Sequence, residues 1–172
     1  MKQPTLRPQD VVLLLKLALI GDARWTFSGI GKELLLPQSE VHASFHRIRT
    51  ARLVSEGEPP SVARQNLREF VLHGVRYAFP PIVGQIAQGI PTAEGGPTLS
   101  KDIVAGPEGS HVWPSSLGSH RGPSLLPLYP KAPVAAANDP ELYELLTLID
   151  ALRVGAARER ELASREIGKR LA

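Results

Sequence analysis

The pattern of apolar and polar positions in the first fifty residues predicts three short helices. The first is expected from Pro8 to about Leu19, since proline is favoured in a first helical turn and Asp10 is favoured near the positive end of the helix dipole. Gly21-Asp22 is a typical stop and turn. The apolar residues of the first helix cover most of its circumference, which indicates burial on more than one side. They are Val11, Val12, Leu14, Leu15, Leu17, Ala18 and Leu19.

The second and third helices are predicted close behind the first. Residues 25–27 have the β-propensity of a short strand, and Ser28 then stands where it can cap a helix over residues 29–35. After a polar turn, Ser39 is the expected N-cap of a third helix that reaches to about residue 51.

Apolar residues in these two helices have the spacing of a helix-turn-helix. Val41, Phe45 and Ile48 stand at positions i, i+4 and i+7 and form one stripe, which can pack on the apolar side of the second helix. The opposite face offers polar, imidazole and basic groups: Gln38, Ser39, His42, Ala43, His46, Arg47 and Arg49. Such groups suit DNA, because short polar side chains reach base edges and arginines bind phosphate or guanine.

The segment from Phe27 to Val54, FSGIGKELLLPQSEVHASFHRIRTARLV, together with the leading helix, resembles the winged helix-turn-helix regulators of bacterial transcription, particularly the MarR-like group. In that family the third helix enters the major groove, and the leading helix commonly joins a dimer interface. The resemblance implies base-facing roles for Gln38, Ser39, His42, Ala43 and His46. It implies DNA-backbone contacts for Thr26, Ser28, Lys32, Arg47 and Arg49. The alternative is an ordinary three-helix core whose third helix is solvated or binds protein.

The chain departs from that family after Val54, where a wing of two strands is expected. Residues 55–60 are short and acidic, and a new helical pattern is predicted from Ser61. Arg64 and Arg68 lie four residues apart on one face of that helix, where they either contact the DNA backbone or form a solvated face. Residues 75–79 read like a strand, which can stand in the place of a wing strand.

Proline and glycine are concentrated in residues 80–138, which hold 18 of the 31 in the chain. The short apolar pieces there are set among turns, so this part is predicted to be an extended arm with little secondary structure. A connection of this length is uncommon within a compact domain and more often has a binding role. Trp113 and Tyr129 are the expected anchors, either as part of an ordered arm on the helical core or in docking onto a partner. A flexible linker is the alternative.

Residues 139–172 predict a helical hairpin. Asp139 and Pro140 form a typical helix start, and the apolar stripe that follows has helical spacing: Leu142, Leu145, Leu146, Ile149 and Leu152. Gly155 permits a break before a second amphipathic helix. The hairpin either closes the core or provides a surface for dimerisation or for a partner protein.

The charge of the chain is unevenly distributed. The 172 residues carry a net charge of +3, but residues 1–79 contain 11 basic and 7 acidic side chains, residues 80–138 contain 3 of each, and residues 139–172 contain 6 and 7. The basic excess therefore belongs to the segment with the helix-turn-helix pattern, where it favours a nucleic-acid partner.

Composition and motifs argue against several other classes of protein. The absence of cysteine excludes disulfides, thiolate nucleophiles and sulfur-ligated zinc. His42 and His46 have a spacing that can hold a metal, but no nearby carboxylate completes a ligand set, and phosphate-loop and nucleophile-elbow motifs do not occur. We therefore expect no enzyme, no metal and no cofactor. Apolar runs are far shorter than the roughly 20 residues of a membrane span, and a signal-peptide pattern is missing. The expected location is the cytoplasm, without membrane binding.

These observations predict a mainly α-helical protein with a few short strands. It would consist of a winged helix-turn-helix head (1–79), a Pro/Gly-rich extended arm (80–138) and a C-terminal helical hairpin (139–172). The predicted function is sequence-specific binding of double-stranded DNA as a homodimeric transcription regulator. The alternative is an antitoxin-like or adaptor protein that binds a toxin or another partner through the arm and C-terminal helices, and that can also autoregulate by DNA binding. Any effector pocket is expected between the leading helix and the tail.

Overall fold

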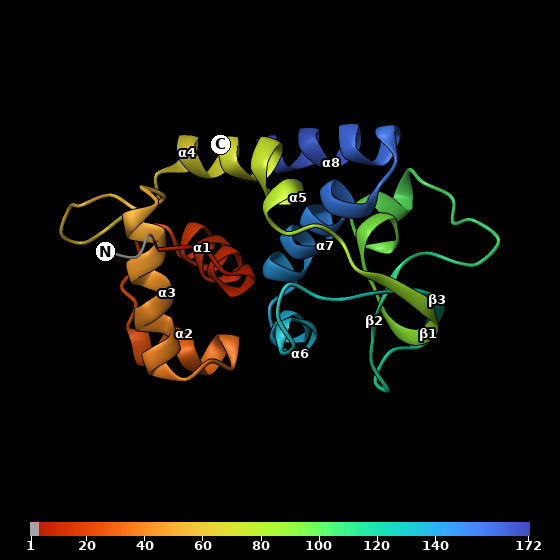
Figure 1. The fold of residues 1–172 in the computed structure, drawn as a ribbon, viewed down its shortest axis with the longest axis horizontal. Coiled ribbons are helices and arrows are strands. Elements are labelled where there is room, and N and C mark those ends of the chain that lie inside the picture. Colours follow the sequence, from red (N-terminus) through yellow and green to blue (C-terminus); the bar gives the residue numbers. More distant parts are fainter. Residues whose placement is uncertain (1–3) are drawn as a thin grey trace.

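The first third of the chain folds into the helices that its apolar spacing predicts. In the computed structural model, which describes residues 4–172, α1 (Pro8–Ile20), α2 (Phe27–Leu34) and α3 (Gln38–Thr50) lie at one end of an elongated molecule (Figure 1). α1 packs on α3 on one side and on α7 (Pro140–Val154) on another. Its residues 11–15 are all buried, so the prediction of burial on more than one side is confirmed.

The starts of α2 and α3 differ from the predicted ones. Thr26, and not Ser28, is the N-cap of α2, because its Oγ1 accepts a hydrogen bond from the Gly29 amide at 3.0 Å. Residues 25–27 therefore lead into the helix and do not form a strand. α3 follows Pro37 directly, so Ser39 lies in its first turn and not at its cap.

A narrow loop over residues 53–63 (the 53–63 loop) follows α3. Its base is closed by one antiparallel bridge between Val54 and Val62, and the Ser55 amide donates to the Ser61 carbonyl at 2.8 Å. Helix formation resumes only at residue 64, later than predicted, because residues 61–63 pair back along residues 53–55.

Residues 64–78 form one helical segment, and the strand predicted over residues 75–79 is wrong. The segment consists of α4 (Arg64–Glu69), a π-helical turn, η1 (Phe70–Gly74), and α5 (Val75–Ala78). Leu67, Val71 and Val75 are buried at spacings of four, so the apolar residues form one stripe with the period of a helix and not of a strand. Five residues of apparent alternation were too few to distinguish the two periods.

Residues 80–138 contain a small sheet where an extended arm was predicted. β1 (Val83–Pro91) pairs antiparallel with β2 (Val112–Pro114) and with β3 (His120–Leu125), and β2 meets β3 in parallel, so the sheet closes on itself. Two short 3₁₀ turns, η2 (Ala93–Gly95) and η3 (Leu99–Lys101), lie between β1 and β2. The fold is therefore mixed α/β, with the sheet at the end of the molecule opposite α3 (Figure 1).

Glycine allows this sheet to close. A Cβ atom on Gly89 would lie 2.0 Å from the carbonyl oxygen of Trp113, and one on Gly118 would lie 2.0 Å from the backbone of Gly89. Backbone segments approach too closely at these points for any side chain to fit between them. Part of the glycine excess thus reflects close backbone packing and not a loose linker.

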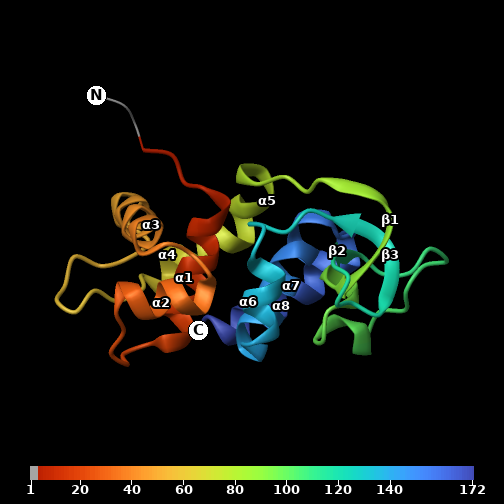
Figure 2. The same cartoon turned by 90° about the horizontal axis from the view of Figure 1, so that it is seen from below.

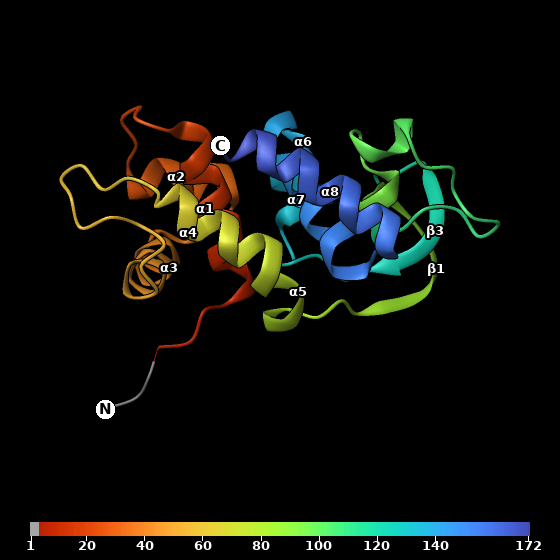
Figure 3. The same cartoon turned by 90° about the horizontal axis from the view of Figure 1, so that it is seen from above.

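The predicted C-terminal hairpin is confirmed, and its first helix, α7, lies at the centre of the molecule. α6 (Ala132–Ala137) precedes α7, and α8 (Ala157–Arg170) returns along α7. The Asp139 carboxylate caps α7 by accepting from the Leu142 amide at 3.0 Å, as predicted. Residues 145–153 of α7 are all buried. Figures 2 and 3 show α7 between the N-terminal helices and the sheet, so this helix closes the core.

A buried carboxylate joins α7 to the sheet. Asp150 is 1% exposed. Its Oδ2 accepts hydrogen bonds from Trp113 Nε1 at 2.7 Å and from Thr92 Oγ1 at 2.8 Å. Its Oδ1 lies 2.7 Å from Nη1 of Arg153. Burial raises the pKa of Asp150, and the charge of Arg153 together with the two hydrogen bonds offsets this only in part.

Arg153 also joins α7 to the backbone just before β1. Its Nε donates to the carbonyl of Phe79 at 2.7 Å, and its Nη2 donates to the carbonyl of Pro80 at 3.2 Å. These two carbonyls belong to the segment that leads from α5 into β1. One turn of α7 therefore fixes the chain before β1, after β1 and on β2.

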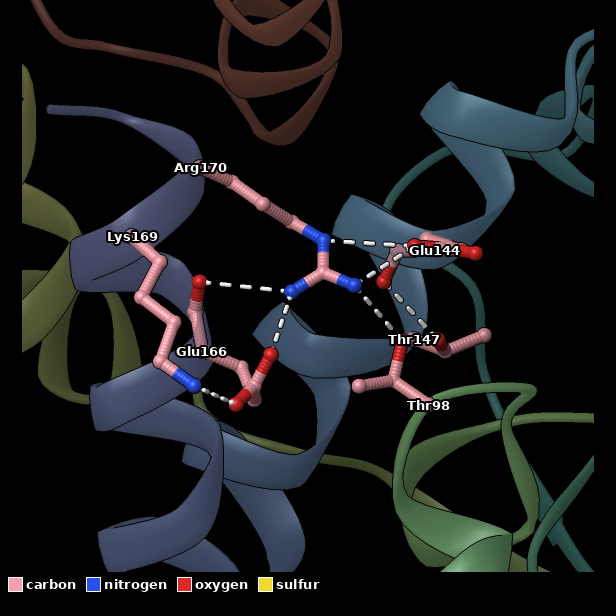
Figure 4. A network of polar contacts seen from close by, with 6 residues as sticks. All are labelled: Thr98, Glu144, Thr147, Glu166, Lys169 and Arg170. Atoms are coloured by element: carbon pink, nitrogen blue, oxygen red, sulfur yellow. Dashed lines mark hydrogen bonds and ion pairs between the residues drawn. The ribbon is translucent and has the colours of Figure 1, made fainter.

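The last turn of α8 is held by a second polar network, drawn in Figure 4. Arg170 lies 2.7 Å from Oε2 of Glu144 on α7 and 2.6 Å from Oε2 of Glu166 on its own helix. It also donates to Thr98 at 3.4 Å. Hydrogen bonds from Lys169 and Arg170 lower the pKa of Glu166. The network joins α8 to α7 and to the turn before η3.

Replacing Asp150 with asparagine should destabilise the whole fold. The Asp150→Asn variant keeps the size of the side chain but leaves the buried Arg153 without its counter-charge, so the free energy of unfolding should fall by about 3 kcal/mol. Urea denaturation followed by tryptophan fluorescence measures this change. Asp102→Asn, at an exposed position after η3, is the matched control and should stay within about 0.5 kcal/mol of the parent. Equal midpoints for the two variants would refute the role given to Asp150.

Candidate nucleic-acid interface

The second and third helices are joined by a tight turn. Leu35 adopts a left-handed conformation, with φ of 56°, and the Leu36 amide donates to the Gly31 carbonyl at 2.8 Å. A Cβ atom on Gly31 would lie only 2.7 Å from the carbonyl oxygen of Leu36, so the chain reverses closely over this glycine. Ile30 and Leu34 of α2 and Val41 and Ile48 of α3 are buried in one core, as the apolar spacing predicts.

The opposite face of α3 is open to solvent. Gln38, Ser39, His42, His46 and Arg49 are exposed, and Ala43 is half-buried. The imidazole of His42 stacks on the ring of Phe27 with centroids 3.8 Å apart, so α2 holds this side chain in place. The five proposed base-facing residues therefore share one accessible face of α3, and Figure 3 shows this helix toward the end of the molecule opposite the sheet.

Arg47 does not belong to that surface, contrary to the prediction of a phosphate contact. Its Nε and Nη2 donate to the two carboxylate oxygens of Asp10 at 2.8 and 2.7 Å, and its Nη2 also reaches Ser44 Oγ at 3.0 Å. The side chains of Arg47 and Asp10 are 12% and 1% exposed. Hydrogen bonds to Asp10 raise the pKa of Arg47. Its guanidinium is thus a buried link between α3 and α1.

The other predicted backbone-contacting residues fall into two groups. Thr26, Ser28 and Lys32 are exposed on or just before α2. Arg64, in contrast, donates to the carbonyl of Ala18 at the end of α1 at 3.1 Å and to the carbonyl of Ala172 at 3.4 Å. Its donors therefore have partners within the chain, and the predicted phosphate contact is not supported by its geometry.

The side chain of Arg68 lies beside α8. It is exposed on α4, and a Cβ atom on Gly168 would lie 3.8 Å from its Nη2. Of the two possibilities that the sequence leaves open for this residue, the structure favours a solvated face.

Four exposed cations on or next to α2 and α3 have no ion-pair partner in the described part of the chain. Within residues 4–172, no ion pair involves Arg24, Lys32, Arg49 or Arg52, and all four side chains are exposed. Glu40, the acidic residue of α3, accepts a hydrogen bond from Gln9 of α1 at 2.9 Å. Glu56 and Glu58 are exposed in the 53–63 loop. Exposed acidic side chains also occur beside α2, at Asp22 and at Glu33, where Glu33 is paired with Lys16. Sequence reasoning missed Arg24 and Arg52, although both flank the predicted helices.

Trp113 and Tyr129, which were predicted to dock onto a partner, lie inside the molecule. They are 1% and 4% exposed. Trp113 donates to Asp150, and the Tyr129 hydroxyl donates to the carbonyl of Leu34 at the end of α2. Burial raises the pKa of Tyr129 far above its ordinary value. Because each aromatic ring finds both an apolar pocket and a polar partner within the chain, the docking role is corrected to a core role.

A cleft of about 570 Å³ lies where the sequence places an effector pocket, between α1 and α2 on one side and α6 and α7 on the other. Lys16 is on its wall and binds Glu33 at 2.5 Å and Asp139 at 2.8 Å. Burial lowers the pKa of Lys16, but the hydrogen bonds to these two carboxylates raise it overall. These ion pairs neutralise Lys16 within the protein, and the wall of the cleft also carries Lys32 and Glu141.

One histidine pairs with a carboxylate away from α3. His111 Nδ1 lies 2.9 Å from Oε1 of Glu94. Burial alone would raise the pKa of Glu94, but the hydrogen bonds from His111 lower it overall, and the same contact raises the pKa of His111. The pair fixes η2 to the start of β2. Among the residues that the structure describes, no group of three or more histidine or acidic side chains is placed to hold a metal ion.

Comparison with protein-family models, curated proteins and solved structures found no match. The resemblance to winged helix-turn-helix regulators therefore rests on the residues of this chain alone. Over residues 4–172, none of the helices combines the length and the apolar character that crossing a membrane requires.

Removing Arg47 should cost stability, which distinguishes it from Arg49. Arg47→Ala leaves the buried Asp10 carboxylate without its partner, so we expect the free energy of unfolding to fall by about 3 kcal/mol or more. Arg49→Ala, on the exposed side of the same helix, should change it by less than about 0.5 kcal/mol. Thermal and urea denaturation of the two variants measure the difference. If both unfold like the parent, the buried link between α1 and α3 does not hold the fold.

Proposed function

We propose that this protein binds double-stranded DNA and that α3 enters the major groove. The observation that carries the proposal is the exposed face of α3, which presents hydrogen-bonding side chains without an acidic residue among them. α3 lies at the outer end of the molecule, so a duplex can approach it without meeting the sheet (Figure 1). In this arrangement α3 has the place of a recognition helix in the helix-turn-helix.

The proposed contacts follow from the positions of the side chains. Base edges would be read by Gln38, Ser39, His42, Ala43 and His46. The stacking of His42 on Phe27 limits the rotation of this imidazole, so less conformational entropy is lost when it meets a base. The DNA backbone would be contacted by Thr26, Ser28, Lys32 and Arg49.

The 53–63 loop occupies the position of a wing in this proposal. It follows α3 directly and is closed at its base by the bridge between Val54 and Val62. Its exposed Glu56 and Glu58 would be repelled by phosphate, so this loop is expected to add little affinity. We therefore place most of the electrostatic contribution on α2 and α3.

Regulation of transcription by occupancy of a pseudo-palindromic site would require two copies of the chain. α7 is buried within its own chain, so it is not the surface through which two copies would meet. Large apolar side chains are exposed instead at the sheet: Ile82 at 62%, Val83 at 48%, Ile86 at 47% and Leu126 at 54%. Exposed apolar side chains gathered in this way are a typical feature of protein contacts. They favour, as a second candidate function, binding to another protein chain.

The DNA-binding proposal can be tested without knowing the target sequence. Fragmented genomic DNA is incubated with the full chain, the bound fragments are sequenced, and a recovered duplex is used for fluorescence anisotropy. Arg49→Gln should weaken binding about five- to tenfold and reduce the slope of log affinity against log salt by about one. Arg121→Gln, an exposed arginine on β3, is the control and should bind like the parent. Failure to enrich any fragment, or equal binding by the two variants, would contradict the proposal.

The oligomeric state tests whether the exposed apolar side chains of the sheet join two copies of the chain. Light scattering on the purified chain should give a dimer, and Ile86→Asp should convert it to a monomer because a charge would be placed in an apolar contact. Thr50→Asp, an exposed position on α3, is the control and should remain a dimer. A monomeric parent would remove the homodimer from the proposal.

A further inference from the structure

Within residues 4–172, one side of β1 has no strand partner over residues 83–87. β1 pairs with β3 along residues 83–89, but it pairs with β2 only along residues 89–91. Just after β2 the chain turns, and the Gly118 amide donates to the Ser115 carbonyl at 3.2 Å. We call the open side of residues 83–87, which faces away from β3, the β1 edge.

The backbone of Ile86 points to this open side. Alternate residues of an antiparallel strand direct their N–H and C=O groups to opposite sides. The Gln88 carbonyl accepts a hydrogen bond from the Ser115 amide at 3.1 Å, so Gln88 faces the side of β2. Ile86, two residues earlier, faces the same side, where β2 does not extend. On the other side it lies opposite Pro123, which has no N–H to donate.

Apolar side chains lie beside these free backbone groups. A bulge between Val83 and Ile86 places them opposite Leu125 and Pro123, which are two residues apart on β3. Because paired residues share a face of a sheet, Val83 and Ile86 lie on the same face in spite of their odd spacing. With Ile82 and Leu126, which are also exposed, they present apolar area on the order of 400 Å².

The β1 edge lacks the residues that commonly prevent pairing. Lysine or proline on an open edge blocks the approach of another strand, but residues 82–90 contain neither. Between Arg76 and Glu94 the sequence has no charged side chain at all. An acidic or basic partner therefore finds no counter-charge here, whereas a second copy of this neutral strand meets no repulsion. Charge complementarity thus favours the chain itself as the occupant.

We propose that two copies of the chain pair antiparallel through the β1 edge. Ile86 of one copy would lie opposite Ile86 of the other, and each amide would donate to the opposite carbonyl across a twofold axis. The inference rests on the second candidate function, binding to another protein chain, and specifies both the partner and the contact. Because the same edge is used in both copies, the contact closes at a dimer and cannot continue into a fibre.

The pairing would separate the two α3 helices widely. β1 leads from α5 away from the N-terminal helices (Figures 2 and 3), and antiparallel pairing reverses its direction in the second copy. The two α3 helices would therefore lie at opposite ends of the dimer. A globular chain of this length is about 40 Å across, which places these helices more than about 50 Å apart. Half-sites in consecutive turns of DNA are only about 34 Å apart.

If α3 binds DNA as proposed above, such a dimer would not occupy two adjacent half-sites. It would instead hold two separate duplex segments, one at each end. The dimer would thus act as a bridge between distant sites, and this step rests on the proposed DNA-binding function.

Hydrogen exchange tests the strand pairing directly. Exchange of single amides is measured by mass spectrometry with fragmentation, in dilute and in concentrated solutions of the parent chain. The Ile86 amide should exchange at least tenfold more slowly in the concentrated solution. The Leu126 amide, which donates to Ile82 at 3.0 Å, should be protected in both. The amide of the exposed Val104 should exchange fast in both.

A charge on the β1 edge should break the dimer. Ile86→Lys would place two ammonium groups side by side, so we expect the dissociation constant from sedimentation to rise at least tenfold. Val104→Lys, an exposed apolar residue away from β1, is the matched control and should dimerise like the parent. Circular dichroism checks that both variants are folded, and the exchange measurement on the parent needs no variant.

Spin labels test the arrangement of the dimer. The chain has no cysteine, so Arg121→Cys on β3 and Thr50→Cys on α3 each provide one labelling site. Labels at position 121 should lie within about 30 Å of each other, since they flank two neighbouring strands. Labels at position 50 should lie more than about 50 Å apart. The reverse order of these distances would overturn the proposal.

Three other outcomes would also overturn it. They are a chain that stays monomeric at all concentrations, a dimer in which the Ile86 amide exchanges as fast as in the monomer, and assemblies larger than a dimer. A monomeric chain whose Ile86 amide is protected by an uncharged extended peptide would make the β1 edge a site for a strand of another protein.

Bridging is measured with the duplex recovered above. One copy of it is fixed to beads, and a second, fluorescent copy is added with the protein. The parent and Val104→Lys should capture the fluorescent duplex on the beads, whereas Ile86→Lys should bind the fixed duplex but lose at least four-fifths of the capture. If the β1 edge pairs and no duplex is ever bound, the pairing remains and the proposed DNA binding fails. If the duplex binds and the Ile86 amide is never protected, DNA binding remains and the pairing fails.

Discussion

The carboxylate of Asp150 is the constraint on which the second half of the molecule depends. A charge buried so completely is tolerated only because it has a counter-charge and hydrogen-bond donors, and here these come from Arg153, Trp113 and Thr92. Each of these partners belongs to a different part of the chain around the sheet or to α7 itself. The cost of leaving Asp150 unsatisfied therefore selects one arrangement of strands around α7. The three-stranded sheet is ordered in this way by α7.

The two ends of the molecule are joined through the same central helix. Lys16 on α1 binds Asp139, which caps α7, and Tyr129, just before α6, donates to the carbonyl that ends α2. The N-terminal helices are thus fixed to the rest of the chain from two directions. A rigid connection of this kind places the exposed face of α3 in a constant orientation relative to the sheet, where the exposed apolar side chains are found.

Features that depend on neighbouring residues could be read from the sequence, and features that depend on distant ones could not. The start of α7 follows from Asp139-Pro140, and the packing of α2 on α3 follows from apolar spacing. The sheet was missed because its strands pair across the long turn between Pro91 and Val112, and because glycine was interpreted as flexibility where it allows close backbone contact. In the candidate site, the polar face of α3 was predicted. The role of Arg47 was not, since its partner lies 37 residues away.

The carboxylate of Asp10 accepts hydrogen bonds from two different parts of the chain. It accepts a hydrogen bond from the Arg7 amide at 2.8 Å at the start of α1, and it accepts hydrogen bonds from Nε and Nη2 of Arg47 on α3. The rotation of α3 about its own axis is therefore set by a buried residue of α1. A turn of about 100° separates successive residues of a helix, so a change in this rotation would alter which side chains of α3 face solvent. If α3 reads DNA as proposed, its sequence preference can thus be altered from a buried residue of α1.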